Sequence, residues 1–283
     1  MDNSDWQASL PLLVDRCAER WSLTLGDRLD GGALAEVRGC TGPNGEDLVL
    51  KMSPPMAKPA YEAAALAHWR GHGAAKLVAW DADDGALLLK RVRPGTFLME
   101  RDRSTPDDEL AIRAASQVLR ALQSAPAPAG GTFPSFEERM QWWLEFTARY
   151  GEADAVGTRM LPLIERAALR LHASTQRQTL AHGDFVAKNM LLGTNGYYVA
   201  IDPLPLIADP CLDIGQFTAY HSPVATVLDR ARSIADATGN DRDRAEGWAA
   251  VWTAFQACET WREDSDDVQR WAVGEDCQRL LRT

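Results

Sequence analysis

The sequence lacks any paired arrangement of cysteines. Its five cysteines are odd in number and widely scattered, and none of them forms a Cys-x-x-Cys pair or has a nearby histidine. This spacing matches none of the common zinc-site patterns and gives no basis for a disulfide framework. We therefore expect reduced thiols with mostly structural roles.

The sequence also lacks a long apolar run. No stretch approaches the roughly 20 consecutive apolar residues that a membrane-spanning helix needs. Residues 1–6 contain two aspartates and no basic cluster, unlike a secretory signal. We therefore expect a cytoplasmic protein with no membrane partner.

Basic residues are too few to predict a nucleic-acid-binding surface. The 283-residue chain contains 40 Asp and Glu against 30 Lys and Arg, a net charge of -10. Duplex binding needs clustered Lys and Arg to neutralise phosphates, so we expect no nucleic-acid partner. The acidic balance fits a cationic small molecule better, although many proteins are acidic only for solubility.

No internal repeat is present, and a hydrophobic content of 46% is that of a globular protein. In the first third of the chain, turn residues separate short apolar segments that are typical of strands. Pro59 stands where a helix can begin, ahead of an alanine-rich segment. The patterns predict strands at 23–29, 35–40, 48–52, 77–81 and 86–90, and a helix at 61–69.

The sequence pattern predicts that the remainder of the chain is mainly helical. Apolar residues recur at three- and four-residue spacing, which predicts helices at 109–123, 136–150, 156–175, 222–238 and 243–263. One predicted β-hairpin interrupts them, at 190–192 and 197–201, with a turn that contains Asn195-Gly196. We therefore expect an α+β fold with a small β-rich lobe, residues 1–92, and a larger helical lobe, residues 93–283.

The most informative segment is His-Gly-Asp-Phe-Val-Ala-Lys-Asn, from His182 to Asn189, with Asp202 thirteen residues later. In phosphoryl transfer one carboxylate orients the attacking hydroxyl, while an amide oxygen and a second carboxylate hold Mg²⁺ against the nucleotide phosphates. Asp184 alone would equally suit a turn, and His182 alone a buried core position. The prediction of catalysis therefore depends on the whole set.

This segment resembles the catalytic loop of the aminoglycoside phosphotransferases, relatives of the protein kinases, whose loop reads His-x-Asp-x-x-x-x-Asn. The run from Ile201-Asp202-Pro203 to Asp213 is most similar to the streptomycin 6-kinase and hydroxyurea phosphotransferase branch of that family. The resemblance covers roughly residues 20–275. It implies a protein-kinase-like fold of two lobes, an antiparallel β N-lobe and a helical C-lobe.

The resemblance also implies a role for each residue that matches the motif. Asp184 would act as the base or orient the acceptor hydroxyl, and His182 would support the loop. Asn189 and Asp202 would bind the metal ion. Asp213 would brace the catalytic loop from a following helix.

The N-terminal part supplies candidates for nucleotide binding. A kinase-like fold needs a strand lysine for the phosphates and a helix glutamate that positions it. Lys51 and Glu62 occupy suitable places, although a surface lysine and a solvated glutamate would look the same. Backbone groups at Gly32 and Ala33 would face the phosphates, but this segment has two glycines where the protein-kinase loop has three, so an ordinary turn is the alternative.

Residues 87–95 resemble the connection between the two lobes of a kinase. Backbone groups around Lys90 and Val92 would pair there with adenine. The resemblance implies ATP as the phosphate donor, with GTP as the alternative, and Mg²⁺ as the metal ion.

The sequence indicates the residues that bind the phosphate acceptor less clearly than those that bind the nucleotide. In this family carboxylates and aromatic faces of the helical lobe hold cationic antibiotics, and Glu259, Glu263 and Asp264 are the candidates for that role. A tryptophan stripe that includes Trp248 and Trp252 precedes them. Such a stripe is more often core packing, and an acidic run is usually a solvated face.

The predicted function is phosphate transfer from ATP to a hydroxyl of a streptomycin-like aminoglycoside, by a monomer or a dimer. One alternative is a kinase of another small metabolite, such as an amino alcohol, a sugar, a nucleoside or hydroxyurea, on the same fold. Another is a nucleotide-binding regulatory module without turnover. A protein kinase is disfavoured because no Ala-Pro-Glu element follows Asp202.

Overall fold

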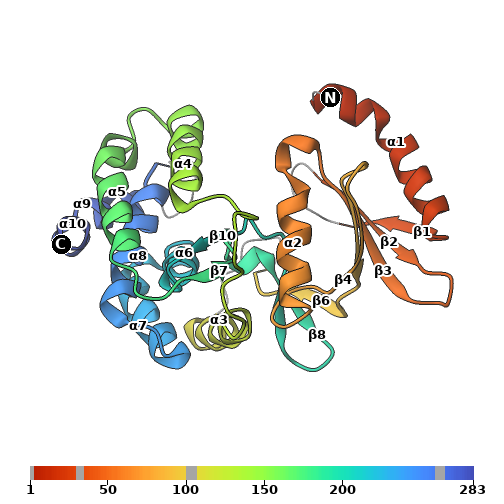
Figure 1. Ribbon diagram of the computed structural model, residues 1–283. Helices are drawn as coiled ribbons and strands as arrows, with labels where there is room; N and C mark the ends of the chain where they lie inside the picture. The colour runs from red at the N-terminus through yellow and green to blue at the C-terminus, as the bar shows by residue number, and fades with distance from the viewer. Residues whose placement is uncertain (1–2, 30–34, 100–106, 259–264) are drawn as a thin grey trace. The chain divides into compact units, whose positions relative to one another are not determined.

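The computed structural model describes residues 3–29, 35–99, 107–258 and 265–283. The chain forms two compact units (Figure 1). The first comprises residues 1–96 and 191–202, and the second comprises residues 97–190 and 203–283. The first is built around an antiparallel sheet and the second is mainly helical, which confirms the predicted α+β class.

A five-stranded antiparallel sheet forms the centre of the first unit, in the order β1-β2-β3-β5-β4. Its strands are β1 (Thr24–Arg28), β2 (Glu36–Thr41), β3 (Asp47–Met52), β4 (Leu77–Asp81) and β5 (Ala86–Lys90). Because side chains alternate along a strand, Leu48, Leu50 and Met52 lie on one face of β3 and Lys51 lies on the other. The sheet therefore separates an apolar face from the face that carries Lys51.

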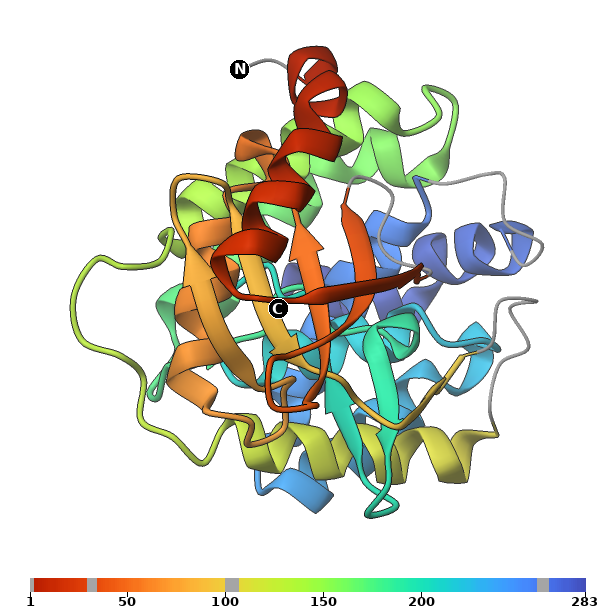
Figure 2. The ribbon, with the colours of Figure 1, turned by 90° about the vertical axis from the view of Figure 1, so that its right-hand side faces the viewer.

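Helix α1 (Asn3–Arg20) covers the apolar face of this sheet. Figure 2 shows it lying across the strands. Trp6 and Val14 of the helix join Leu50 and Met52 of β3 in one buried cluster. Burial of apolar surface on both sides of this contact stabilises the first unit at about 25 cal/mol per Å² removed from water.

Helix α2 and a hairpin complete the first unit. After the 3₁₀ helix η1 (Pro55–Ala57), α2 (Pro59–Trp69) begins at its predicted proline. The predicted hairpin forms as β8 (Met190–Gly193) and β9 (Tyr198–Ala200), in a three-stranded sheet with β6 (Pro94–Phe97). Ala75 N donates to Ala200 O at 2.9 Å, and Ala200 N donates to Gly73 O at 2.8 Å. These bonds hold the residues that follow β9 within the first unit.

The second unit consists mainly of helices. The first turn of α3 (Asp108–Leu122) is capped by Asp107, whose side chain accepts from Leu110 N at 2.8 Å. Helix α4 (Phe136–Tyr150) starts with a reciprocal capping box between Ser135 and Glu138. The helices are α3 (Asp108–Leu122), α4 (Phe136–Tyr150), α5 (Val156–Ala173), α6 (Cys211–Ala219), α7 (Val227–Thr238), α8 (Arg242–Gln256), α9 (Ser265–Val273) and α10 (Glu275–Arg282), with the 3₁₀ helices η2 (Ala187–Asn189) and η3 (Val224–Thr226). Strands β7 (Thr179–Ala181) and β10 (Leu206–Ala208) pair antiparallel among them.

Two predicted helices differ from the observed ones. The helix expected at 243–263 ends at Gln256, and the helix expected from residue 222 begins at Val227, after η3. Ser222 lies in a bend, and the 3₁₀ helix η3 follows Pro223 before α7 begins. In the described residues, no helix is both long enough and apolar enough to cross a membrane.

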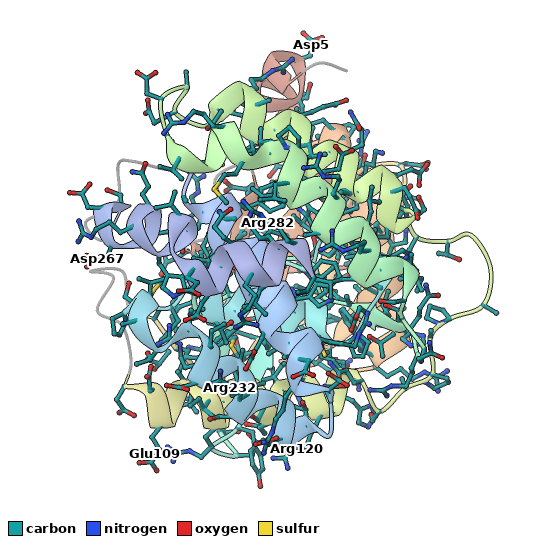
Figure 3. The ribbon with its side chains drawn as sticks, turned by 90° about the vertical axis from the view of Figure 1, so that its left-hand side faces the viewer. Asp5, Glu109, Arg120, Arg232, Asp267 and Arg282 are labelled. Carbon is teal, nitrogen blue, oxygen red and sulfur yellow. The ribbon has the colours of Figure 1, made fainter. Side chains whose placement is uncertain are left out.

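Helices α6 and α8 cross at very close range in the centre of the second unit. A Cβ atom placed on Gly215 would lie 2.4 Å from the carbonyl carbon of Trp248, so the two backbones nearly touch. Trp248 itself is 1% exposed. Charged side chains such as Glu109, Arg120 and Asp267 instead point outwards from this unit (Figure 3).

We expect Gly215→Ala to lower the free energy of unfolding by about 1–3 kcal/mol, because the added methyl group would overlap the backbone of Trp248. Gly247→Ala is the matched control, since a Cβ there would meet only the end of the Leu171 side chain, at 3.1 Å. It should change stability by less than about 1 kcal/mol. Urea denaturation followed by tryptophan fluorescence measures both, and equal effects would contradict the close crossing.

Candidate active site

Three charged side chains meet in the first unit. The ammonium group of Lys51 lies 2.7 Å from each carboxylate oxygen of Glu62 and 2.7 Å from Oδ1 of Asp202. Lys51 and Glu62 are 6% and 8% exposed, whereas the side chain of Asp202 is 30% exposed. The lysine is therefore held between two carboxylates, one buried and one reachable from solvent.

Local structure explains how these three residues are presented. Lys51 lies in the middle of the sheet, opposite Val37 of β2 and Leu87 of β5. Glu62 lies in the first turn of α2, where the helix dipole favours a carboxylate. Asp202 follows β9 and has a φ of 57°, in the left-handed region that aspartate tolerates better than most residues. Two regular elements and one constrained turn thus hold the three charges.

The charge of Lys51 is secured by its partners. Burial on its own would lower the pKa of this lysine, because an ammonium ion loses hydration. The carboxylates of Glu62 and Asp202 outweigh that effect and raise the pKa of Lys51 above its ordinary value. Lys51 therefore remains a cation at neutral pH.

The segment that carries Asp184 follows strand β7 in the second unit. Pairing of Ala181 with Leu206 fixes the end of that strand. Gly183 then adopts a φ of 74°, and a Cβ atom there would lie 2.1 Å from the carbonyl oxygen of Leu204. Only glycine fits this turn, because the obstacle is a backbone atom that cannot move aside.

Asp184 and Asn189 are tied to each other within this loop. The side-chain amide Nδ2 of Asn189 donates to Oδ2 of Asp184 at 2.7 Å and to the carbonyl oxygen of Asp184 at 2.9 Å. Asn189 N donates to Val186 O at 2.9 Å, which closes η2. Because Nδ2 is turned towards Asp184, the oxygen Oδ1 of Asn189 is directed away from it.

Asp213 braces the loop from helix α6. Its Oδ2 accepts from His182 N at 2.7 Å, and its Oδ1 accepts from Gly183 N at 2.9 Å. Asp213 is 3% exposed. Burial raises the pKa of Asp213 to about 6, although the N–H groups of Gly183 and His182 act in the opposite direction; the negative charge of Asp184 raises it further. The raised pKa shows that burial of the ionised Asp213 costs free energy, even though the carboxylate accepts hydrogen bonds from two backbone N–H groups.

His182 is buried beneath the loop and is 0% exposed. Its ring packs edge-on against Phe185, with the ring centroids 5.8 Å apart. The backbone N–H of Asp184 points to Nδ1 of His182 at 3.4 Å, a long hydrogen bond. This placement suits a residue that supports the loop.

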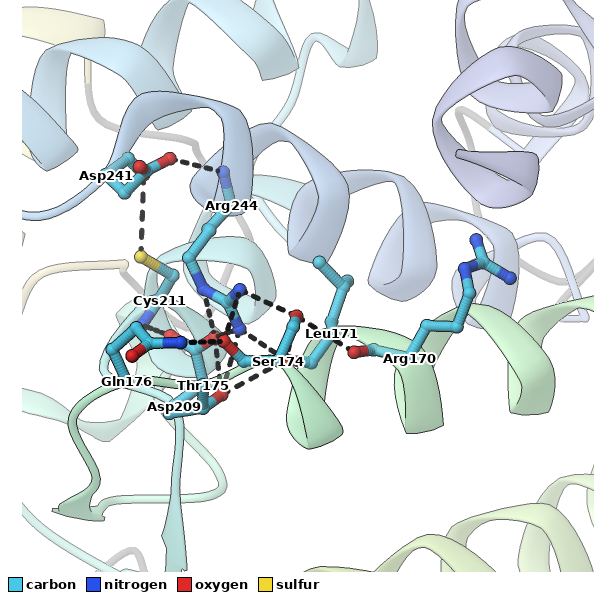
Figure 4. Close-up of polar contacts among 9 residues, drawn as sticks. All are labelled: Arg170, Leu171, Ser174, Thr175, Gln176, Asp209, Cys211, Asp241 and Arg244. Atoms are coloured by element: carbon cyan, nitrogen blue, oxygen red, sulfur yellow. Dashed lines mark hydrogen bonds and ion pairs between the residues drawn. The ribbon is translucent and has the colours of Figure 1, made fainter.

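A second buried carboxylate, Asp209, fixes the start of α6. It is 1% exposed and accepts from Cys211 N at 2.8 Å. The guanidinium group of Arg244 donates to it through Nε, at 2.7 Å, and through Nη2. Arg244 also donates to Leu171 O and, at 2.8 Å, to the hydroxyl of Thr175, as Figure 4 shows. One side chain therefore links the end of α5 and the start of α8 to the residues that lead into α6.

Three residues around this loop were not predicted from the sequence: Asp209, Arg244 and Gln216. Gln216 lies three residues after Asp213 in α6, is 4% exposed, and accepts from Phe185 N at 2.7 Å through Oε1. Positions three apart share a helix face. That spacing would have pointed to Gln216 once α6 was known to be a helix.

Several predicted residues lie outside the described part of the chain: Gly32, Ala33, Glu259, Glu263 and Asp264. Their roles in phosphate and acceptor binding stay predictions.

The roles of Lys90 and Val92 in adenine binding also stay predictions. Lys90 ends β5, and its N–H donates to Lys76 O at 2.9 Å. The tryptophan stripe, in contrast, is core packing, because Trp248 and Trp252 are 1% and 4% exposed.

The donor chemistry of two residues fits a magnesium ion. No described residue donates a hydrogen bond to Oδ1 of Asn189, and Lys51 contacts only Oδ1 of the Asp202 carboxylate. Amide and carboxylate oxygens are the ligands that Mg²⁺ prefers, with only one or two from protein and others from substrate phosphates. The described residues contain no group of three or more His, Cys, Asp or Glu side chains that could hold a metal ion.

The raised pKa of Asp213 predicts a pH-dependent stability. Because the folded-state pKa of about 6 lies above the ordinary 3.8, the folded chain binds this proton more tightly than the unfolded chain. Stability contributed by Asp213 is therefore present at low pH and is lost as the pH rises towards and through 6. Relative to Asp213→Asn, the unfolding free energy of the wild type should fall by about 1–2 kcal/mol between roughly pH 5 and pH 8.

Urea denaturation across this pH range measures the difference. Asp243→Asn, at an exposed position of α8, is the control and should track the wild type. A difference between wild type and Asp213→Asn that does not vary with pH would contradict the raised pKa.

Comparison with known structures shows the fold. A choline/ethanolamine kinase family protein from Mesorhizobium loti superposes with a TM-score of 0.65 at 16% identity, over 95% of this chain and 98% of that one. Aminoglycoside phosphotransferase APH(2'')-Ib also superposes, with a TM-score of 0.53 at 15% identity. The protein-kinase-like fold predicted from the catalytic segment is confirmed.

Sequence comparison identifies the family. The chain is 29% identical over 253 residues to a streptomycin 6-kinase of Streptomyces glaucescens, covering 86% of this chain and 80% of that protein. It is 30% identical over 264 residues to a hydroxyurea phosphotransferase of Kitasatospora aureofaciens, covering 92% and 75%. Residues 20–265 match the family model described as aminoglycoside/hydroxyurea antibiotic resistance kinase. The resemblance drawn from the catalytic segment is thus confirmed, and the chain belongs to the aminoglycoside/hydroxyurea antibiotic resistance kinase family.

Proposed function

We propose that this phosphotransferase moves the γ-phosphoryl group of ATP to a hydroxyl group of a streptomycin-like aminoglycoside. Membership of the kinase family gives the reaction type. The observation that carries the proposal is the fixed pair of Asp184 and Asn189, joined by the 2.7 Å hydrogen bond. This pair presents a carboxylate for the acceptor and an amide oxygen for a metal ion from one short loop.

Asp184 is proposed to accept a hydrogen bond from the acceptor hydroxyl and to aim its oxygen at the γ-phosphorus. Because transition states of phosphoryl transfer are mostly loose, orientation contributes more than early proton removal. Asp213 holds the backbone on the N-terminal side of Asp184, and Asn189 holds its carboxylate. The loop thus fixes the direction of the carboxylate before an acceptor binds.

Lys51 is proposed to bind the nucleotide phosphates. Its position between Glu62 and Asp202 keeps the ammonium charged and restricts its motion. Asn189 and Asp202 would hold Mg²⁺, which neutralises charge on the phosphate oxygens when bound. Glu62 is assigned no contact with the nucleotide and acts by holding Lys51.

Two observations support a cationic acceptor. The chain has a net charge of -10, and a relative 29% identical to it is named a streptomycin 6-kinase. An acidic protein attracts a polycation at a rate that falls as salt rises. Hydroxyurea is the second candidate, because the hydroxyurea phosphotransferase relative aligns over 92% of this chain. Turnover of that neutral acceptor should depend little on salt.

Coupled ADP release with Mg²⁺ and ATP, across streptomycin, other aminoglycosides, hydroxyurea and simple amino alcohols, tests the proposal. We expect turnover with streptomycin, and we expect Asp184→Ala to reduce it by about a hundred- to ten-thousandfold. Asp243→Ala, at an exposed position, should retain wild-type turnover. Turnover of Asp184→Ala within tenfold of wild type would refute the role of Asp184.

The acceptor panel also separates the alternatives. Turnover with hydroxyurea or an amino alcohol alone would keep the kinase and change its substrate. ATP binding without turnover on any acceptor would favour a regulatory module.

Glu62→Gln should raise the KM for ATP by about tenfold, because one of the two hydrogen bonds from Lys51 to Glu62 is lost and the other no longer ends on a charged oxygen. The value of kcat should change less than KM, since Glu62 does not contact the acceptor in this scheme. Glu109→Gln, whose side chain is 88% exposed, is the control and should leave both constants unchanged. ATP-saturation kinetics measure the split, and an unchanged KM for ATP in Glu62→Gln would argue against Lys51 as a phosphate ligand.

A further inference from the structure

The side-chain amide of Gln216 contacts the backbone on both sides of Asp184. Oε1 of Gln216 accepts from Phe185 N at 2.7 Å, and Nε2 donates to Gly183 O at 3.4 Å, a long hydrogen bond. Gln216 is 4% exposed. The two bonded groups belong to the residues that immediately precede and follow Asp184, so the amide holds both peptide groups of that residue.

Gln216 and Asp213 act on successive parts of the same loop. Asp213 accepts the N–H groups of His182 and Gly183, and Gln216 accepts the N–H group of Phe185. Both side chains come from one face of α6, three residues apart. Three backbone N–H groups in four residues are therefore taken up by one helix.

A neutral amide suits this position for a chemical reason. The Gly183 carbonyl needs a donor and the Phe185 N–H needs an acceptor, and the amide of glutamine supplies both from one planar group, as a protonated acid also would. The negative charge of Asp184 already raises the pKa of Asp213. A further carboxylate here would add to that repulsion.

We propose that Gln216 is a positioning residue for the phosphotransfer reaction, holding the peptide groups on both sides of Asp184 so that its carboxylate keeps the direction the acceptor requires. This inference rests on the proposed role of Asp184. Gln216 itself touches no reactant. Its loss should therefore lower kcat and leave the KM for ATP nearly unchanged.

Two substitutions separate positioning from packing. Gln216→Met keeps a similar volume and removes both hydrogen bonds, so it should lower kcat by about ten- to a hundredfold, the scale of a small misplacement. Gln256→Met is the matched control, because Gln256 is also a buried glutamine, 1% exposed, and no residue of the described chain hydrogen-bonds its amide. It should retain the wild-type kcat.

Gln216→Glu supplies a readout that packing would not produce. When protonated, the new carboxyl group can donate to Gly183 O and accept from Phe185 N, as the amide does. When ionised, it cannot donate and is repelled by Asp213 on α6 and by Asp184 on the loop. The other titratable groups on the loop are the buried ring of His182 and the exposed ammonium group of Lys188. The kcat of Gln216→Glu relative to wild type should therefore rise several-fold as the pH is lowered from about 8 to about 6.

The experiment is steady-state kinetics of the three variants with the active acceptor, together with hydrogen exchange of the loop amides in the intact protein. Gln216→Met should lower kcat and speed exchange at Phe185, whereas Gln256→Met should do neither. The proposal would be overturned by a kcat of Gln216→Met within twofold of wild type. It would also be overturned if the kcat of Gln216→Glu, divided by that of the wild type, did not vary with pH. If the wild type turns over no acceptor, the proposed function fails, and exchange at Phe185 still decides whether Gln216 holds the loop.

Discussion

The second unit is organised around the buried carboxylate of Asp213. A carboxylate removed from water is costly unless hydrogen bonds compensate it, and here the N–H groups of His182 and Gly183 do so. The requirement is mutual, because those N–H groups need an acceptor as well. Helix α6 supplies the carboxylate of Asp213, and the loop that carries Asp184 must take the conformation in which its N–H groups reach that carboxylate.

The rest of the second unit keeps α6 in place. Arg244 joins the end of α5 and the start of α8 to Asp209, just before α6, and Gly215 lets α8 approach α6 at backbone distance. In the first unit the same principle governs Lys51, whose charge is matched by Glu62 and Asp202. Each unit thus holds one of the proposed functional groups by burying an ionised side chain against fixed partners, an arrangement that favours preorganisation.

The segment that carries Asp184 was easier to recognise in the sequence than the scaffold that supports it. Asp184 and Asn189 were recognisable because their types and spacing suit phosphoryl transfer and resemble a known catalytic loop. Lys51 was recognisable because it follows a short apolar run, residues 48–50, that is typical of a strand. Helix α1 was not predicted, because it contains Pro11 and its apolar stripe is weak. All the residues of the short helix α6 are buried, so it lacks the polar face that reveals a helix in sequence. The roles of Gln216 and Arg244 depend on contacts between residues far apart in the chain, so they could not be predicted before the helices were known.

A double-mutant cycle on kcat between Asp213 and Asp184 tests the central claim, that α6 serves the reaction by directing the carboxylate of Asp184. The cycle compares wild type, Asp213→Asn, Asp184→Ala and the double variant, all measured on folded protein with saturating substrates. If Asp213 acts only through Asp184, its substitution should have almost no further effect once Asp184 is alanine. Additive effects of the two substitutions would mean that Asp213 contributes independently, and would contradict this account.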